Sequence, residues 1–435
     1  MTKTDVEFQA GLAARAAAVE ILEGVLADGR RLDELWARAE GLPPRDAGFA
    51  RALTYAALRE FGRLQFALAS FLPKPPEGRA GAILLCGAAE LLVLKGAPHA
   101  AVDCAVRLAK GGSARRLAPL VNAVLRRISE VGPEAFGELD PELNAPDWLL
   151  KRLKGNFGEA GTLAILAAHR AGAPLDLTPR DPAEAALWAE KLGARLTPGG
   201  ASLRLQPQGA VTALPGFAEG AWWAQDAAAA FPARMLGDVK GLRVLDLCAA
   251  PGGKTLQLAA AGAEVTALDV SDSRLERLSE NLARTGLKAE IVAADALEWR
   301  PESRYDAILL DAPCSASGTI RRHPDLPHLR GAKSGGPEKG LSLIQDRLLR
   351  RAADWLKPGG AMVYAVCSLW PEEGAQRVTA LLKARPELRR EAPPAGAVPP
   401  ELLDASGALS TRPDLWPETG GMDGFHASLL RKAPA

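Results

Sequence analysis

The feature that most constrains the fold is an alternation of apolar runs and helical segments that begins at Gly241 and continues for most of the remaining chain. The apolar runs lie at 242–247, 264–269, 290–294, 305–311 and 361–367. Helical segments at 254–261, 271–285 and 340–356 connect them. Because this alternation is typical of parallel strands joined by right-handed crossover helices, it predicts a doubly wound sheet with strand order 3-2-1-4-5.

Two regions of different character precede this sheet. Residues 8–130 have helical periodicity rich in Ala, Leu and Arg, including one helix over 49–71 that ends before the prolines at 73–76. An acidic, Pro-containing stretch from 128 to 148 indicates a linker. The 435 residues therefore predict a multidomain α/β protein: an all-helical domain at 1–135, a small α+β module at 145–235 with a helix over 182–192, and the sheet domain at 236–435.

Composition excludes several classes of protein. The net charge is +1, so any anionic partner must be bound by a local patch of basic residues. No uncharged apolar stretch reaches the roughly 18 residues of a membrane span, and the N-terminus lacks the apolar run of a signal peptide. The five cysteines are odd in number and include no Cys-x-x-Cys pair, which argues against both a disulfide framework and structural zinc. We expect a cytoplasmic protein with no metal and no membrane association.

The loop after the first strand of the sheet has the character of a cofactor-binding loop. Pro251-Gly252-Gly253 allows backbone N–H groups to approach a ligand at the start of a helix. Asp269 ends the second strand, where a carboxylate can accept the hydroxyl groups of a ribose. Asp295 follows the third strand, in a position to accept a hydrogen bond from an adenine amino group, and Asp311 ends the fourth.

Two other types of nucleotide-binding loop fit this part of the sequence less well. A P-loop needs a glycine where Cys248 stands, although Gly253-Lys254-Thr255 and the strand ending at Asp311 fit a nucleotide hydrolase. A dinucleotide-binding dehydrogenase needs Gly-x-Gly-x-x-Gly, which is absent. The hydrolase stays open at this point as an alternative.

Two of the five cysteines follow the last two predicted strands, at the edge of the sheet where a ligand is expected to bind. Cys86, Cys104 and Cys248 fit the common role of a buried cysteine as a small apolar residue. Cys314 and Cys367 instead follow the fourth and fifth strands, which are neighbours in the predicted order, so both thiols should face one crevice beside the cofactor.

Methylation of a pyrimidine at C5 uses both a thiol and a methyl donor. The C5 carbon is a poor nucleophile until a thiolate adds to C6. A second thiol is explained by the later elimination step, and Asp311 can hydrogen-bond the N3/N4 edge of a cytosine. The residues alone do not rank the two thiols.

Three motifs resemble the RNA (cytosine-5)-methyltransferase family: Asp-Leu-Cys-Ala-Ala-Pro-Gly-Gly-Lys-Thr at 246–255, Asp-Ala-Pro-Cys-Ser-Ala-Ser-Gly-Thr-Ile-Arg-Arg-His-Pro-Asp at 311–325, and Cys-Ser-Leu-Trp-Pro-Glu-Glu at 367–373. The helical region, with Ala-Pro-His-Ala-Ala-Val at 97–102 and Leu-Val-Asn-Ala-Val-Leu-Arg-Arg at 120–127, is similar to the NusB-like RNA-binding domain of the bacterial 16S ribosomal RNA methyltransferase B subfamily. Leu-Pro-Gly-Phe at 214–217 matches its middle region.

The resemblance implies roles for individual residues. Cys367 would be the nucleophile, Cys314 would assist product release, and Asp311 would act beside them. The S-adenosyl-L-methionine site would be lined by Cys248, Ala249, Ala250, Pro251, Gly252, Gly253, Lys254, Asp269, Asp295 and Asp311. Departures from the family pattern are Val366, Gly374, His426 and an inserted loop at 331–340.

The implied partner is 16S ribosomal RNA of the small subunit, bound by a chain that we expect to be a monomer. Two basic clusters are candidates for phosphate contacts. The first comprises Arg321, Arg322, Arg330, Lys333, Lys339, Arg347, Arg350, Arg351 and Lys357, and the second Arg107, Lys110, Arg115, Arg116, Arg126 and Arg127. Trp222 and Trp223 are either core aromatics or surfaces for base stacking. A non-catalytic RNA-binding factor built around the helical domain is a further alternative.

Overall fold

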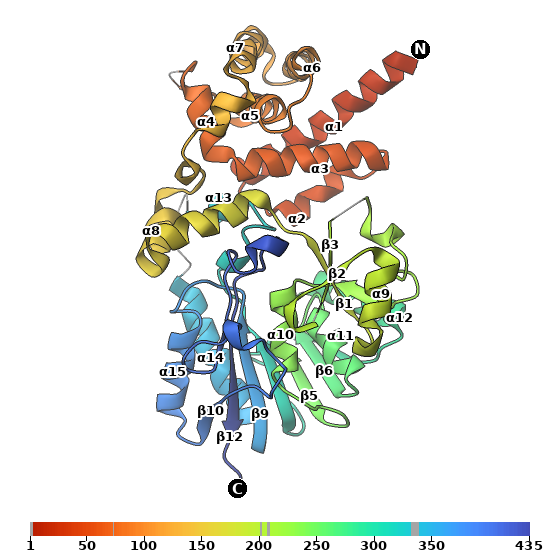
Figure 1. Cartoon of the computed structure of the whole chain (residues 1–435), viewed down its shortest axis with the longest axis vertical. Coiled ribbons are helices and arrows are strands. Elements are labelled where there is room, and N and C mark those ends of the chain that lie inside the picture. Colours follow the sequence, from red (N-terminus) through yellow and green to blue (C-terminus); the bar gives the residue numbers. More distant parts are fainter. Residues whose placement is uncertain (1–2, 73, 201, 207–208, 332–338) are drawn as a thin grey trace. The chain divides into compact units, whose positions relative to one another are not determined.

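The computed structural model describes residues 3–72, 74–200, 202–206, 209–331 and 339–435, and it divides into two compact units (Figure 1). The first unit comprises Met1–Ala171 with Ile320–Pro337, and the second comprises Gly172–Thr319 with Glu338–Ala435. Within the described ranges, each helix falls short of the length and apolar character that a bilayer span requires.

The first unit is helical, as predicted. Its helices are α1 (Lys3–Leu26), α2 (Leu32–Leu35), α3 (Pro44–Arg59), α4 (Phe61–Ala69), α5 (Gly78–Leu92), α6 (Pro98–Lys110), α7 (Ala118–Gly137), α8 (Asp147–Ala171) and α13 (Leu326–Gly331). Leu and Ala side chains from α1 and α3 to α7 form one core, because the apolar residues recur at helical spacing. The apolar helix α5, with Cys86 buried in it, lies in this core.

The single helix predicted over 49–71 is wrong, because the chain breaks at Glu60 between α3 and α4. Glu60 leaves helical geometry, and its carboxylate accepts hydrogen bonds from Arg63, Asn144 and Arg170. The apolar periodicity continues across the break since both helices bury one face in the same core.

The predicted linker over 128–148 is also wrong. Helix α7 continues to Gly137 through a kink at Gly132, which has a φ of 74°, and α8 begins at Asp147. Pro133 follows that kink and starts a new helical stretch, where a missing N–H costs nothing. The helical unit therefore extends to Ala171, beyond the predicted end at 135.

A segment from the predicted sheet domain is built into the helical unit. Asp325 is 2% exposed, and its carboxylate accepts a hydrogen bond of 3.0 Å from the backbone N–H of Leu32. The Arg321 carbonyl accepts one from Arg59, and the Arg321 side chain is fully buried. Arg321 therefore cannot serve the phosphate-binding surface predicted for it.

The second unit contains the predicted parallel sheet. Its strands are β5 (Arg243–Leu247), β6 (Glu264–Asp269), β7 (Glu290–Ala293), β8 (Tyr305–Asp311), β9 (Leu356–Val366), β10 (Leu388–Glu391), β11 (Leu409–Ser410) and β12 (His426–Lys432). The order β7-β6-β5-β8-β9 is 3-2-1-4-5, which confirms the prediction, and β12 and β10 extend the sheet in antiparallel fashion.

Helices cover both faces of this sheet (Figure 1). Helices α10 (Ala227–Arg234) and α11 (Gly253–Ala260) pack on one face, and α14 (Lys339–Trp355) and α15 (Ala375–Ala384) on the other. Helix α12 (Asp272–Thr285) buries its leucines against β6 and α11. Because helices cover both faces, the carboxyl ends of the parallel strands are the edge where a ligand can bind.

The small antiparallel sheet has the order β2-β3-β1-β4, with α9 (Ala185–Leu192) beside it. Its strands are β1 (Leu175–Pro179), β2 (Arg195–Leu196), β3 (Leu203–Leu205) and β4 (Trp222–Ala224). Trp222 and Trp223 on β4 are 0% and 3% exposed. They are core residues, so the alternative of base stacking is wrong.

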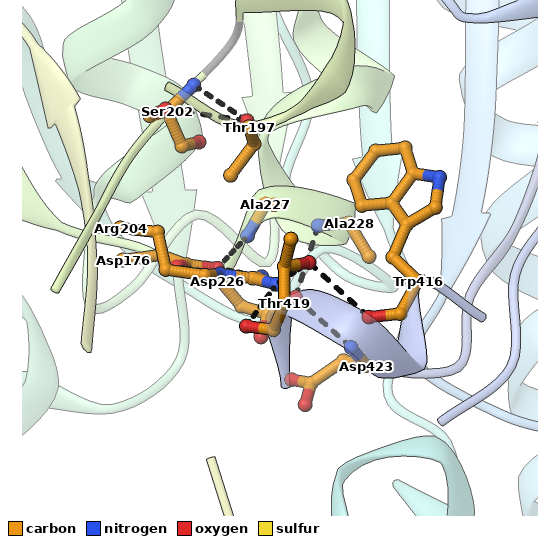
Figure 2. Close-up of polar contacts among 10 residues, drawn as sticks. All are labelled: Asp176, Thr197, Ser202, Arg204, Asp226, Ala227, Ala228, Trp416, Thr419 and Asp423. Atoms are coloured by element: carbon orange, nitrogen blue, oxygen red, sulfur yellow. Dashed lines mark hydrogen bonds and ion pairs between the residues drawn. The ribbon is translucent and has the colours of Figure 1, made fainter. Parts of the chain in front are cut away.

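Buried polar contacts tie this small sheet to the large one (Figure 2). The Asp176 carboxylate accepts two hydrogen bonds of 2.7 Å from Arg204 and one of 3.0 Å from the N–H of Ala227, the first residue of α10. The carboxylate of Asp226 caps α10 and also accepts from the backbone N–H of Asp423, at 3.0 Å. If either Asp176 or Arg204 lost its partner, the other would remain as a buried, unpaired charge. We therefore expect the small sheet and the large sheet to unfold together.

Candidate active site

The turn after β5 brings backbone groups to the carboxyl edge of the sheet. Gly252 has a φ of 107°, and a Cβ there would lie 2.3 Å from the side chain of Leu278. Only glycine fits this position, because both the conformation and the space exclude a side chain. Helix α11 begins at the next residue, so its first N–H groups point toward the edge where an anionic or polar ligand binds. Cys248 has a φ of 59° in this turn, and burial raises the pKa of its thiol.

Asp269 lies at this edge and is 2% exposed. Its carboxylate accepts hydrogen bonds from the N–H groups of Ala250 and Ser271, at 3.1 and 2.9 Å, and from Arg274 at 2.8 Å. A carboxylate has about four acceptor positions, so this one can still accept a ligand hydroxyl. The next residue, Val270, is 68% exposed and offers an apolar surface beside the carboxylate.

Asp295 lies close by, because β6 and β7 pair in parallel with Asp269 opposite Ala293. It is exposed, and its carboxylate accepts a 2.8 Å hydrogen bond from the N–H of Leu297. Asp295 therefore shapes a turn at this edge of the sheet, and its Oδ2 has no hydrogen-bond partner among the residues that the structure describes.

Lys254 and Asp311 form an ion pair of 2.7 Å between α11 and the end of β8. Burial acts to lower the pKa of Lys254, but the charge and hydrogen bond of Asp311, with the charges of Asp246 and Cys367, outweigh it and raise that pKa. The lysine therefore stays cationic next to Cys367.

Asp246 on β5 is fully buried, and burial raises its pKa to about 7. Its Oδ2 accepts a 2.6 Å hydrogen bond from Thr255, and its Oδ1 has no partner among the residues that the structure describes. The folded protein therefore binds a proton that the unfolded chain releases near pH 3.8, so Asp246 costs stability as the pH rises from about 4 to 7.

Replacing Asp246 by asparagine should remove this pH dependence. The amide keeps an acceptor for Thr255 and carries no charge at any pH. A pKa difference between 3.8 and about 7 corresponds to at most about 4 kcal/mol. We expect Asp246→Asn to match the wild type at pH 4 and to exceed its free energy of unfolding at pH 8, measured by urea denaturation. An equal difference at both pH values would contradict this.

The two predicted thiols meet at the ends of β8 and β9. These strands pair in parallel with Asp311 opposite Ala365, and the Sγ atoms of Cys314 and Cys367 lie 3.4 Å apart. The hydrogen bond with Cys367, burial, and the negative charges of Cys367 and Glu373 together raise the pKa of Cys314 well above its usual value. Cys314 therefore holds its proton at neutral pH.

A buried network behind the thiols was not predicted. Its members are Tyr364, Ser315, Ser317, Ser368 and Glu373, all at most 4% exposed. The serines follow the two cysteines in the sequence, and the glutamate belongs to the third motif. These positions were visible in the motifs, but no sequence pattern reveals that one carboxylate contacts both loops.

Three of the nine residues of the first basic cluster, Arg321, Arg351 and Lys357, are buried or bonded to other groups of the protein. Arg351 donates hydrogen bonds to the backbone carbonyls of Ala296 and Trp299, and Lys357 pairs with Asp306 at 2.6 Å. Arg347 and Arg350 are exposed. The side chains of Arg330, Lys333 and Lys339, with most of the loop 331–340, lie outside the described residues.

The second basic cluster is exposed throughout. Its members lie on the end of α6, on the short 3-10 helix Arg115–Leu117 and on α7: Arg107, Lys110, Arg115, Arg116, Arg126 and Arg127. Six exposed cations on adjacent elements of one unit give a surface that suits phosphate groups.

The parallel sheet, the glycine turn and the carboxylates at its edge define a methyltransferase that depends on S-adenosyl-L-methionine. The site suits this cofactor, since Gly252 permits close approach and Asp269 retains acceptor capacity for hydroxyls. The chain belongs to the RsmB/F family of 16S rRNA methyltransferases, whose model matches residues 233–431, while a NusB family model matches residues 12–130.

Named relatives resemble the chain over almost its whole length. Ribosomal RNA small subunit methyltransferase B of Vibrio cholerae is 34% identical over 96% of this chain and 97% of its own. The protein of the same name from Xanthomonas campestris is 36% identical over 98% of each chain. The solved structure titled "Crystal Structure of PH0851" has a TM-score of 0.78 at 24% identity, covering 97% of this chain and 98% of its own, which supports the fold.

Proposed function

We propose that this protein transfers a methyl group to C5 of a cytosine in 16S ribosomal RNA, through a transient bond between Cys367 Sγ and C6 of the base. The observation that carries the proposal is the 3.4 Å separation of two thiols at the cofactor edge of the sheet. One thiol suffices to add to C6. A second thiol is needed only if the first sulfur must later be eliminated from C6.

The environments of the thiols support separate roles. Cys314 keeps its proton beside Cys367 and near Glu373. Cys367 lies near the Lys254 ammonium, and its charge acts to raise the pKa of that lysine. This asymmetry supports Cys367 as the nucleophile and Cys314 as its assistant, a ranking that the sequence reached only by resemblance.

Each step can be assigned to residues of the chain. The Cys367 thiolate bonds to C6, and the electron pair displaced from the C5–C6 double bond makes C5 nucleophilic. The bound cofactor supplies an electrophilic methyl group on its sulfonium sulfur. The proton of C5 then passes to water while the C6–S bond breaks, and the Cys314 S–H donates a hydrogen bond to the departing sulfur. Asp311, held by Lys254, is placed to orient the N3/N4 edge of the base.

The exposed basic cluster on α6 and α7 supports RNA as the substrate, because exposed cations bind phosphates without reading sequence. The target base must leave its stack to reach both thiols, which costs a few kcal/mol and favours loops and junctions of the RNA. The helical unit would then contribute affinity, and the sheet unit the chemistry.

The identity of the methylated nucleoside tests the proposed function. Unmodified 16S rRNA, made by transcription, would be incubated with the protein and methyl-labelled S-adenosyl-L-methionine, then digested to nucleosides and analysed by mass spectrometry. We expect the label to co-elute with 5-methylcytidine. Label on N4 of cytidine, on a ribose 2′-oxygen or on uridine would overturn the assignment. Binding of RNA without any transfer would favour the non-catalytic factor.

A further inference from the structure

We propose that Glu373 is a positioning residue that ties the Cys314 and Cys367 loops together and places a negative charge on the Cys314 side of the pair. The inference rests on the function proposed above and adds to it the residue that keeps the two thiols in separate roles.

The carboxylate of Glu373 contacts the residue after each cysteine. Its Oε1 accepts a 2.9 Å hydrogen bond from the N–H of Ser315, and its Oε2 accepts one of 2.5 Å from the Ser315 hydroxyl. The Ser368 hydroxyl also donates to Oε2. Since Ser315 follows Cys314 and Ser368 follows Cys367, one carboxylate group holds both loops.

Further contacts fix the glutamate itself. Glu373 is 2% exposed, and the Tyr364 hydroxyl donates a 2.5 Å hydrogen bond to its backbone carbonyl. The hydroxyls of Ser315 and Ser368 lie 3.2 Å apart. A buried, fully bonded network of this kind has little freedom to rearrange, so it sets the distance between the two loops.

The carbonyl of Cys367 provides a separate tie between the loops, accepting a 3.1 Å hydrogen bond from the N–H of Gly318. The loops would therefore stay associated if Glu373 lost its charge and kept its shape. This separates the two effects of the glutamate: its hydrogen bonds hold the two loops together, and its charge acts to raise the pKa of Cys314.

Charged groups around Cys314 act in a definite direction. Cys367 and Glu373 both raise its pKa, and the charge of Cys314 in turn acts to raise the pKa of Tyr364. The cation of the site, Lys254, interacts with Cys367. Removing the Glu373 charge should therefore lower the pKa of Cys314 and make it compete with Cys367 as a thiolate.

The test compares Glu373→Gln with Glu373→Ala in the full chain without RNA. Alkylation of each cysteine by iodoacetamide at pH 8, followed by mass spectrometry, reports the thiolate. Binding of phenylarsine oxide, which bridges two adjacent thiols, reports their distance. We expect Glu373→Gln to raise the alkylation rate of Cys314 about tenfold, as one pKa unit would, with arsenical affinity nearly unchanged. Glu373→Ala should lower the arsenical affinity at least about tenfold.

The matched control is Asp346→Asn, which removes one carboxylate charge from α14 whose ion pair is with Arg377 at 2.8 Å. It should leave both readouts unchanged. Equal alkylation of Cys314 in Glu373→Gln and Asp346→Asn would overturn the charge role. If Glu373→Ala does not fold, as judged by thermal melting, Ser368→Ala takes its place, and unchanged arsenical binding there would overturn the tie.

The rate of methyl transfer tests whether the contacts of Glu373 matter for the proposed function. We expect Glu373→Gln to lower kcat for methyl transfer about tenfold, with KM for RNA and for S-adenosyl-L-methionine unchanged, since the residue is buried. Failure of the wild type to form 5-methylcytidine would end the proposed function but leave the thiol measurements valid. If the wild type forms 5-methylcytidine and Glu373→Gln has the same kcat, Glu373 is not a positioning residue.

Discussion

Replacing Cys367 by alanine is expected to lower the rate of methyl transfer at least about a thousandfold, because no other group can activate C5 of the base. Cys314 lies 3.4 Å away in the wild type, and burial and the charge of Glu373 still act to raise its pKa in the variant, so it is a poor substitute. The measurement is transfer of labelled methyl groups to 16S rRNA under single-turnover conditions, which isolates chemistry from product release.

Two controls make this result specific. Binding of S-adenosyl-L-methionine, measured by calorimetry, should be retained in Cys367→Ala, since the glycine turn and Asp269 are untouched. Cys104→Ala removes a thiol that is 2% exposed in α6 of the helical unit and should leave the transfer rate near that of the wild type. A Cys367→Ala protein that still methylates at the normal rate would remove the thiolate from the mechanism.

The position of the thiols was predictable because it depends on strand order alone. Once five strands follow the order 3-2-1-4-5, the loops after the fourth and fifth must be neighbours, whatever their detailed conformation. The same argument brought Asp269 and Asp295 to one edge. Periodicity and the length of each apolar run carry this information in the sequence.

Contacts that depend on side-chain geometry were not predictable. The sequence Pro-Glu-Glu does not indicate which of the two glutamate side chains is buried. Glu373 is the buried one, because hydrogen bonds to the Trp370 carbonyl and from the Tyr364 hydroxyl fix the turn before α15. Arg321 shows the same limit, since its charge suggested a phosphate contact and its burial in the helical unit excludes one.

The departures from the family pattern are clearer in three dimensions than in sequence. Val366 pairs with His426 across β9 and β12, and a Cβ added at Gly374 would lie 2.8 Å from the His426 ring. The three departures therefore lie together, so the histidine fills space that a side chain at position 374 would need. Burial lowers the pKa of His426 to about 4, so the ring is neutral at physiological pH and acts as packing.

Replacing Cys314 by alanine is expected to trap the protein on its RNA. Addition of Cys367 to C6 and capture of the methyl group do not require Cys314, so both steps should proceed. Departure of the Cys367 sulfur loses its hydrogen-bond donor, and loss of one donor to a developing negative charge slows such a step roughly a hundredfold. A covalent protein–RNA species should therefore accumulate on a denaturing gel, and digestion of that species should release a methylated cytosine.

Matched variants separate this outcome from others. Cys314→Ser keeps a hydroxyl donor near the departing sulfur and should accumulate less of the covalent species than Cys314→Ala. The double variant Cys314→Ala/Cys367→Ala lacks the bonding atom and should form none, which excludes simple tight binding. If Cys314→Ala instead released product at the wild-type rate, Cys314 would have no part in the departure of the Cys367 sulfur, and the role proposed for it would be wrong.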